Sequence, residues 1–178
     1  MSRLDSFIRR VTAQRDVLDH VCTLLVDLPG PVIELGLGNG RTFHHLREKL
    51  PRRRVIAFDR ALGAHESSIP PGEDLVIGEI SETAARFAGI GAALVHADIE
   101  TNYPDVDAET ARWLPPLAAS LLREGGIVAS GLALCHPELV PLNLPVEVPH
   151  ERYFLYRLGA RTSSSALEPG SLQERLQH

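Results

Sequence analysis

Three glycines on alternate positions, directly after a short apolar run, constrain this chain more than any other feature. The run V-I-E-L at 32–35 predicts a buried strand, and the glycines are Gly36, Gly38 and Gly40. Phe43 and Leu46 then predict a helix over 41–50. Glycine tolerates positive φ and lets the backbone approach a ligand, and the start of a helix presents unpaired N–H groups. The segment therefore predicts a cradle for a ligand that carries an anionic group.

The glycine spacing separates two kinds of nucleotide cradle. The dinucleotide fingerprint G-x-G-x-x-G places its third glycine five residues after the first. Here the third glycine, Gly40, comes four residues after the first, Gly36. The acid Glu34 stands two residues before Gly36. A second acid, Asp59, ends the next apolar run and suits a carboxylate that accepts hydrogen bonds from a ribose diol.

The pattern from Glu34 to Gly40 resembles the E/D-x-G-x-G-x-G motif of class I S-adenosylmethionine-dependent methyltransferases. Three further features carry the same resemblance in the right order: Asp59 after the second strand, Gly78-Glu79 after a third, and Gly125-Gly126 before a fifth. The resemblance covers about 31–131 and a terminal hairpin, and it extends to a small stand-alone bacterial branch of the family without a firmly known substrate.

The resemblance implies an α/β fold: a Rossmann-like, open, twisted and mostly parallel sheet with helices on both faces and a C-terminal antiparallel hairpin. We expect strands at 32–36, 54–59, 74–78, 92–97 and 127–130, then an edge strand at 144–148, a tight reversal and a last strand at 152–158. We expect helices at 3–28, 41–50, 82–89 and 107–124. Ser81 is the predicted N-cap of the third helix, and Pro115-Pro116 should break or restart the fourth.

We divide the chain into three parts. Residues 1–30 form an N-terminal helix packed on the core, residues 31–159 an S-adenosylmethionine-binding Rossmann-like domain, and residues 160–178 a polar C-terminal tail. The apolar stripe of the first helix favours packing against the sheet. A second interpretation of that helix stays open, namely that it lines the substrate side or a dimer seam.

The resemblance implies S-adenosyl-L-methionine as the cofactor and gives its contacts. The glycine turn would hold the methionine end, with the cofactor carboxylate near the start of the following helix. Glu34 would fix the turn in position. Glu79 stands where the family usually has an aspartate that accepts a hydrogen bond from the adenine amino group, and capping of the next helix is its alternative role. The predicted cofactor-binding set is Glu34, Gly36, Leu37, Gly38, Asn39, Gly40, Arg41, Asp59, Arg60, Glu79, Ile80 and Asp98.

No catalytic residue can be assigned from the sequence. Methyl transfer from a sulfonium is a direct displacement, in which the protein mainly supplies position and exclusion of water. A general base is needed only for a hydroxyl or protonated amine, and Asp98, at the end of a strand, is the nearest candidate. A structural or cofactor-organising role for Asp98 stays open. Ser130-Gly131 stand where magnesium-dependent relatives have an Asp-Asn pair, so we predict no metal.

We therefore predict an S-adenosylmethionine-dependent methyltransferase acting on a small molecule. A non-catalytic protein that binds S-adenosylmethionine or S-adenosylhomocysteine on the same fold is the main alternative, and a nicotinamide-dependent oxidoreductase is the second. The net charge of −5 argues against nucleic acid as a partner. No apolar run approaches ~18 residues, so no membrane partner is expected. Cys22 and Cys135 lack metal-ligand spacing and fit a cytoplasmic protein, and the amphipathic first helix suggests a homodimer.

Overall fold

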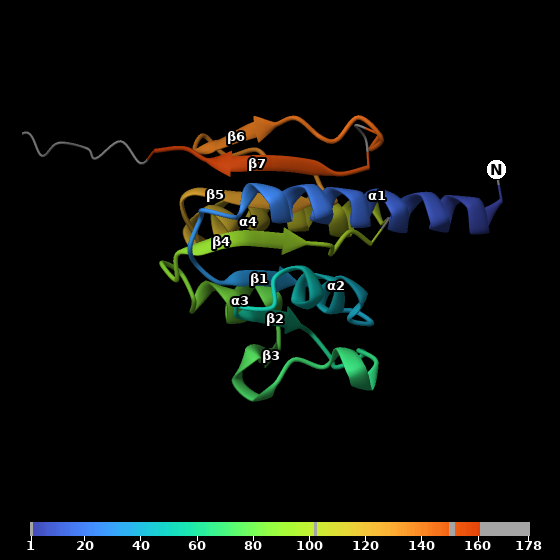
Figure 1. The fold of residues 1–178 in the computed structure, drawn as a ribbon, viewed down its shortest axis with the longest axis horizontal. Helices are drawn as coiled ribbons and strands as arrows, with labels where there is room; N and C mark the ends of the chain where they lie inside the picture. Colours follow the sequence, from blue (N-terminus) through green and yellow to red (C-terminus); the bar gives the residue numbers. More distant parts are fainter. Residues whose placement is uncertain (1, 102, 150–151, 161–178) are drawn as a thin grey trace, which may run out of the picture.

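A seven-stranded sheet forms the centre of the computed structural model, which describes residues 2–101, 103–149 and 152–160 (Figure 1). The strand order is β3-β2-β1-β4-β5-β7-β6. The strands are β1 (Val32–Leu35), β2 (Val55–Asp59), β3 (Leu75–Ile77), β4 (Ala92–Ala97), β5 (Leu122–Ser130), β6 (Leu139–Leu142) and β7 (Phe154–Leu158). The helices are α1 (Arg3–Leu24), α2 (Arg41–Lys49), α3 (Ile80–Ala85) and α4 (Pro104–Leu121), with 3-10 turns η1 (Glu66–Ser68) and η2 (Gly72–Asp74).

The pairing of the strands confirms the predicted fold class. Strands β1 to β5 pair in parallel, whereas β7 runs antiparallel to both β5 and β6. The order reverses between β1 and β4, which lie side by side although β2 and β3 come between them in sequence. In open α/β sheets, ligands bind outside the carboxyl ends of the strands at such a switch point. The glycine turn follows β1 at this place.

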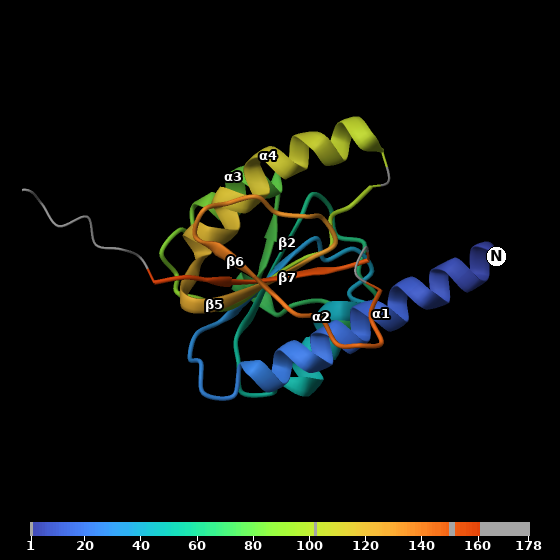
Figure 2. The ribbon, with the colours of Figure 1, turned by 90° about the horizontal axis from the view of Figure 1, so that it is seen from above.

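Helices cover both faces of the sheet, as Figure 2 shows. Strand residues pointing to one face pack with α3 and α4, through side chains such as Ile80 and Leu114. Residues pointing to the other face pack with α1 and α2, through side chains such as Val17 and Phe43. Strand β4 is buried along its whole length, as expected for a central parallel strand covered on both sides. The two layers fix the carboxyl edge of the sheet, where the predicted site residues lie.

Several helix boundaries differ from the sequence prediction. Helix α1 ends at Leu24, because Leu25 caps it and a turn leads to Pro29 and Gly30. Helix α3 begins at Ile80 with Glu79 as its N-cap residue, so the assignment of Ser81 as N-cap is wrong. The Glu79 side chain makes no capping hydrogen bond. The favourable capping propensity of serine is therefore overridden by the short connection from β3.

Helix α4 continues through Pro115 and Pro116, so the predicted break is wrong. Each proline removes one N–H donor from the helix interior. The carbonyl groups that lose these donors belong to Ala111 and Arg112, which are exposed to solvent. The opposite side of the helix is buried in the core, and this packing outweighs the local preference.

The C-terminal hairpin exists but uses a different edge strand. The segment 144–148, predicted as a strand, lies in the loop, and the edge strand is β6 at 139–142. Pro141 is tolerated there because an edge strand has one unpaired side. The connection to β7 is a long loop rather than a tight reversal, and the predicted tail from 161 onward lies outside the described residues. In the part of the chain that the structure describes, no helix is long and apolar enough to cross a membrane.

Candidate functional site

The three glycines of the turn after β1 all have positive φ, but they serve different needs. A Cβ atom on Gly36 would lie 2.5 Å from the Ile99 side chain, and one on Gly40 would lie 2.5 Å from the Ser68 side chain. These two glycines allow the turn to pack against the protein itself. A Cβ atom on Gly38, where φ is 52°, would meet no atom within 4 Å. Gly38 therefore leaves its space open to a ligand.

The Asp59 carboxylate at the end of β2 binds the glycine turn directly. Its Oδ2 atom accepts a hydrogen bond of 2.7 Å from the backbone N–H of Gly38. Its Oδ1 atom accepts from the N–H groups of Arg60 at 2.6 Å and Ala61 at 3.4 Å. An ionised carboxylate offers about four acceptor positions, so about one remains for a hydroxyl group of a ligand.

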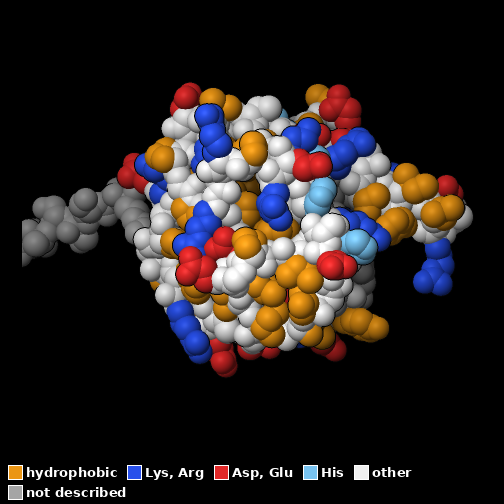
Figure 3. All heavy atoms as spheres, turned by 60° about the horizontal axis from the view of Figure 1, so that its bottom comes forward, with side chains coloured by type: hydrophobic (Ala, Val, Ile, Leu, Met, Phe, Trp, Pro, Cys, Tyr) orange, Lys and Arg blue, Asp and Glu red, His pale blue; other side chains and the backbone are white. Residues whose placement is uncertain are grey.

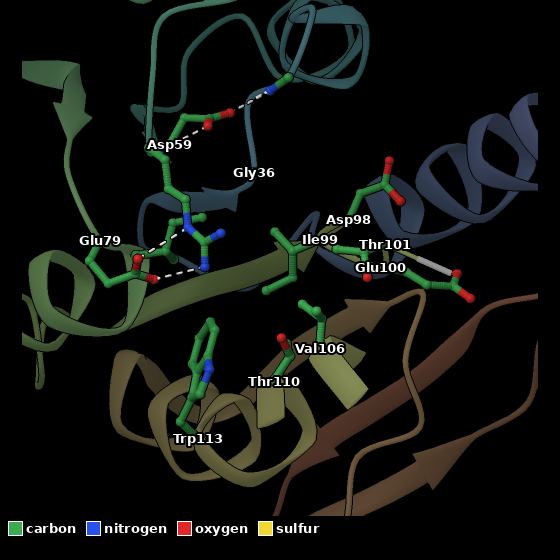
Figure 4. A pocket seen from close by; sticks show the side chains of 13 residues that line it. Gly36, Asp59, Glu79, Asp98, Ile99, Glu100, Thr101, Val106, Thr110 and Trp113 are labelled. Carbon is green, nitrogen blue, oxygen red and sulfur yellow. Dashed lines mark hydrogen bonds and ion pairs between the residues drawn. The ribbon is translucent and has the colours of Figure 1, made fainter. Parts of the chain in front are cut away.

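A main cavity of about 230 Å³ opens beside this turn (Figure 4). The predicted residues that line it come from the ends of four strands, and helix α4 supplies the opposite wall. The lining residues are Gly36, Gly38, Asp59, Arg60, Glu79, Ile80, Asp98, Ile99, Glu100, Thr101, Val106, Thr110 and Trp113. The α4 contribution was not predicted, because Thr110 and Trp113 belong to no motif and only their helical spacing places them on one face.

A side cavity of about 170 Å³ meets the main cavity at Gly36, Gly38 and Asp98, which line both. Helix α1 forms one wall of the side cavity, and the glycine turn with the start of α2 forms the other. Its lining residues are Arg10, Val11, Gln14, Gly36, Leu37, Gly38, Asn39, Arg41, Thr42 and Asp98. Helix α1 thus packs on the core and also forms one wall of the side cavity, while its role at the substrate side or a dimer seam stays a prediction.

Glu34 lies beneath the turn and lines neither cavity. Its side chain is fully buried and accepts hydrogen bonds from the Thr42 hydroxyl and from His96 Nδ1, the latter at 2.8 Å. Burial alone would lower the pKa of His96, but the charge and hydrogen bond of Glu34, with a smaller effect of Asp98, raise it. The hydrogen-bonded pair of Glu34 and His96 therefore supports the turn from below.

The buried polar contacts continue to the other end of the chain. His96 Nε2 is hydrogen-bonded to the Tyr153 hydroxyl, which lies in the loop just before β7. Burial is the main cause that raises the Tyr153 pKa well above its usual value, while a hydrogen bond from Gln14 opposes that rise. The Gln14 amide also donates to Asp98 Oδ2 at 2.6 Å. No sequence motif marks Gln14, His96 or Tyr153, because their contacts depend on the tertiary fold.

Arg60 and Glu79, which both line the main cavity, form an ion pair (Figure 4). The Arg60 Nε and Nη2 atoms lie 3.1 and 3.2 Å from the two carboxylate oxygens of Glu79. Both side chains are substantially exposed, so solvent screens this pair. The pair joins the ends of β2 and β3 beside the Asp59 carboxylate.

Asp98 and Glu100 bring two carboxylates to the end of β4. A Cβ atom on Gly131, after β5, would lie 3.4 Å from Glu100 Oε2 and 3.8 Å from Asp98 Oδ1, so the glycine leaves room for both. Partial burial, followed by the charges of Asp107 and Asp98, raises the pKa of Glu100. Among the described residues, no group of three His, Cys, Asp or Glu side chains could hold a metal ion.

Arg53 and Arg54 lie just before β2, at the opposite edge of the sheet, and have structural partners. Arg53 donates to the carbonyl oxygens of Leu28 at 2.6 Å and Gly30 at 3.1 Å, which holds the chain between α1 and β1. Arg54 Nε lies 2.6 Å from Asp74 Oδ1. These contacts give Arg53 and Arg54 structural roles.

Fold and site together define a Rossmann-like domain with a glycine turn at its switch point and the Asp59 carboxylate at the end of the neighbouring strand β2. A family model described as S-adenosyl-L-methionine methyltransferase matches residues 1–158. The crystal structure of an S-adenosyl-L-methionine methyl transferase from Silicibacter pomeroyi DSS-3 is 40% identical, with a TM-score of 0.82, covering 89% of this chain and 99% of that chain. The chain belongs to the S-adenosyl-L-methionine methyltransferase family.

More distant solved structures share the fold. A putative methyltransferase, yhhF, from Escherichia coli has a TM-score of 0.58 and 14% identity, covering 82% of this chain and 87% of that chain. The S-adenosylhomocysteine-bound methyltransferase PaMTH1 from Podospora anserina has a TM-score of 0.54 and 14% identity, covering 90% and 80%. A search of curated proteins found no match. The protein is an S-adenosylmethionine-dependent methyltransferase, and S-adenosyl-L-methionine is its cofactor.

Proposed function

We propose that the two cavities together bind S-adenosyl-L-methionine, with its nucleoside in the main cavity and its methionine end in the side cavity. The observation that carries this proposal is the open space at Gly38 beside the Asp59 carboxylate. The remaining acceptor position of Asp59 suits a ribose hydroxyl. When bound, the cofactor supplies an electrophilic methyl group on a sulfonium.

The predicted residues take different parts in this proposal. The backbone of the turn and the start of α2 face the methionine end, together with the Arg41 side chain. Arg60, Glu79 and Ile80 face the nucleoside, and Glu79 shares its carboxylate between Arg60 and the adenine amino group. Glu34 acts from below through Thr42 and His96 rather than by contact. The full proposed set is Glu34, Gly36, Leu37, Gly38, Asn39, Gly40, Arg41, Asp59, Arg60, Glu79, Ile80 and Asp98.

In this proposal residues 31–159 form the cofactor-binding unit, and the helix of residues 1–30 adds one wall. The polar C-terminal tail predicted at 160–178 lies outside the described part from residue 161 onward. The helix wall is supported by Arg10, Val11 and Gln14, which line the side cavity. We therefore propose that α1 completes the cofactor site of this domain.

We further propose that the methyl acceptor is a small molecule. The carboxylates of Asp98 and Glu100 lie at the carboxyl edge of the sheet, and Asp107 lies near Glu100. This negative edge and the net charge of −5 disfavour a polyphosphate backbone.

The test uses methyl-labelled S-adenosylmethionine with cell extract separated into metabolites, protein and RNA. We expect label in the metabolite fraction alone. Label in RNA would contradict the small-molecule acceptor and leave cofactor binding intact. Calorimetry with S-adenosylhomocysteine tests the cofactor site separately, and absence of binding would contradict the cavity assignment.

We also propose a homodimer and a cytoplasmic location. Helix α1 projects beyond the body of the protein, and hydrophobic side chains gather on the projecting end (Figures 1 and 3). Leu4, Phe7 and Ile8 are 65%, 39% and 50% exposed there. The free thiols of Cys22 and Cys135 support the cytoplasmic proposal. Light scattering that gives one 19.5 kDa species at micromolar concentration would remove the dimer, and cell fractionation tests the location.

A further inference from the structure

Asp98 lies where the two cavities meet, directly after β4. Asp98 lines both the main and the side cavity, as do only Gly36 and Gly38 among the residues that line them. Its backbone N–H donates to the Leu35 carbonyl oxygen at 3.2 Å, which fixes it beside the end of β1. Asp98 is therefore the carboxylate at the junction between the place proposed for the nucleoside and the place proposed for the methionine end.

The Asp98 carboxylate is held in place by a hydrogen bond from a neutral side chain, that of Gln14. Gln14 Nε2 on α1 donates to Oδ2 at 2.6 Å, and Gln14 is only 8% exposed. The Gln14 amide adjoins the buried Tyr153 hydroxyl, which is bound in turn to His96. The buried groups behind Gln14 restrict its movement, so the direction of the Asp98 carboxylate is fixed before any ligand binds.

The charge of Asp98 is not cancelled by an ion pair. No salt bridge within 4.0 Å between described residues includes Asp98. Arg10 lines the same side cavity and forms no such pair with it. A neutral amide fixes the carboxylate and leaves its charge in place, and charges in a partly buried site act more strongly than in water. The junction therefore favours a positively charged ligand atom.

We infer that Asp98, positioned by Gln14, recognises the positive charge of the sulfonium and so distinguishes the methyl donor from its product. This inference rests on the proposed placement of the cofactor across both cavities. In methyl transfer a lone pair of the acceptor forms a bond to the methyl carbon while the bond between that carbon and sulfur breaks. The electron pair of the broken bond stays on sulfur, which becomes a neutral thioether. The product therefore loses the attraction to Asp98, which favours its replacement by a fresh, charged donor.

The experiment compares the dissociation constants of S-adenosylmethionine and S-adenosylhomocysteine by calorimetry and needs no methyl acceptor. The proteins are the wild type, Asp98→Asn, Gln14→Leu and the double variant. Asp105→Asn is the matched control, because Asp105 is exposed in the first turn of α4, lines neither cavity and carries the same charge. Sinefungin, which carries an amine in place of the sulfonium methyl, serves as a second charged ligand. Melting temperatures and circular dichroism show that each variant is folded.

We expect Asp98→Asn to lower the preference for the charged ligands over S-adenosylhomocysteine about tenfold, the change that ~1.4 kcal/mol produces. Gln14→Leu should lower the same preference and have no further effect in the Asp98→Asn background, whereas Asp105→Asn should leave it unchanged. If Gln14→Leu does not fold, Gln14→Met replaces it as an unbranched substitute. Equal weakening of all three ligands in Asp98→Asn would overturn the charge recognition. Additive effects in the double variant would overturn the positioning by Gln14. A wild type that binds none of the ligands would instead overturn the proposed cofactor site.

Discussion

The carboxylate of Asp59 lies 2.7 Å from the backbone nitrogen of Gly38, so an acid at the end of one strand holds the turn that follows its neighbour. This contact joins the two motif elements before a ligand is present. It also means that Asp59 has two tasks in the proposed site, to shape the glycine turn and to accept a ribose hydroxyl. The effects of replacing it should reflect both.

Replacing Asp59 with alanine should weaken S-adenosylhomocysteine binding by about 1–3 kcal/mol, the scale of a lost hydrogen bond to a charged group. The reason is the loss of the ribose acceptor together with the bonds to the N–H groups of Gly38 and Arg60. Calorimetry measures the dissociation constant. Asp59→Asn keeps one acceptor oxygen and should fall between the wild type and Asp59→Ala. An unchanged dissociation constant in Asp59→Ala would contradict the ribose role.

Gly38→Val should abolish binding of S-adenosylhomocysteine, because its side chain would occupy the open space of the cavity. Gly72 provides a matched control, since it also has a positive φ of 44° and no atom within 4 Å of a Cβ position, but it lines neither cavity. Gly72→Val should show a similar loss of thermal stability and retain affinity. Affinity retained in folded Gly38→Val would count against the cradle.

The buried pair of Glu34 and His96 should dominate the stability of the site. His96→Leu leaves the Glu34 charge buried without its partner and should cost about 3–5 kcal/mol of unfolding free energy. Urea denaturation measures this. His44, which is exposed and 3.9 Å from Glu48, is the control, and His44→Leu should change stability by less than about 0.5 kcal/mol. A cost in His96→Leu no larger than in His44→Leu would show that the pair is not a charged one.

The same pair predicts how stability depends on pH. The pKa of His96 is raised in the folded protein, so its contribution is complete below the ordinary histidine pKa of ~6.5. That contribution is lost as pH rises through the raised value, because the folded state then releases its proton. The unfolding free energy of the wild type should therefore fall over this range relative to His96→Leu. Parallel curves for the two proteins would contradict the raised pKa.

The two cysteines should differ sharply in reactivity. Burial is the main cause that raises the pKa of the Cys22 thiol to about 11, whereas Cys135 is exposed. Since the thiolate is the reactive form, roughly one thiol in a thousand at Cys22 is reactive at pH 8. Iodoacetamide followed by mass spectrometry should therefore modify Cys135 first. Cys135→Ser isolates the slow reaction, and equal rates for both sites would show that Cys22 is accessible.

The sequence predicts the central part of the fold well because each strand there is short, apolar and followed by a distinctive residue. Asp59 and Glu79 lie at the main cavity because they end strands that enter one sheet in parallel. The failures lie where tertiary packing decides the outcome. Helix α4 passes Pro115 because its buried side is anchored in the core, and the edge strand contains Pro141 because one of its sides is unpaired.

In the candidate site, too, features set by local sequence are predictable and features set by tertiary packing are not. The glycine turn is predictable because positive φ is a local property of glycine. The contacts of Gln14, His96 and Tyr153 are not, because residues separated by 57 and 84 positions meet only after folding. Glu34 is part of the glycine motif and so could be predicted, yet its burial beneath the turn depends on His96 from the neighbouring strand.

The position of Tyr153 has a consequence for how the protein matures on the ribosome. Gln14 belongs to the first helix and Tyr153 lies next to the last strand, yet both meet at the end of β4. In a nascent chain that still lacks its final hairpin, His96 has no Tyr153 to bind. Gln14, which positions Asp98 between the two cavities, then also lacks its contact with the Tyr153 hydroxyl. The ability to bind the cofactor should therefore arise late, once strand β7 has left the ribosome and can pair with β5.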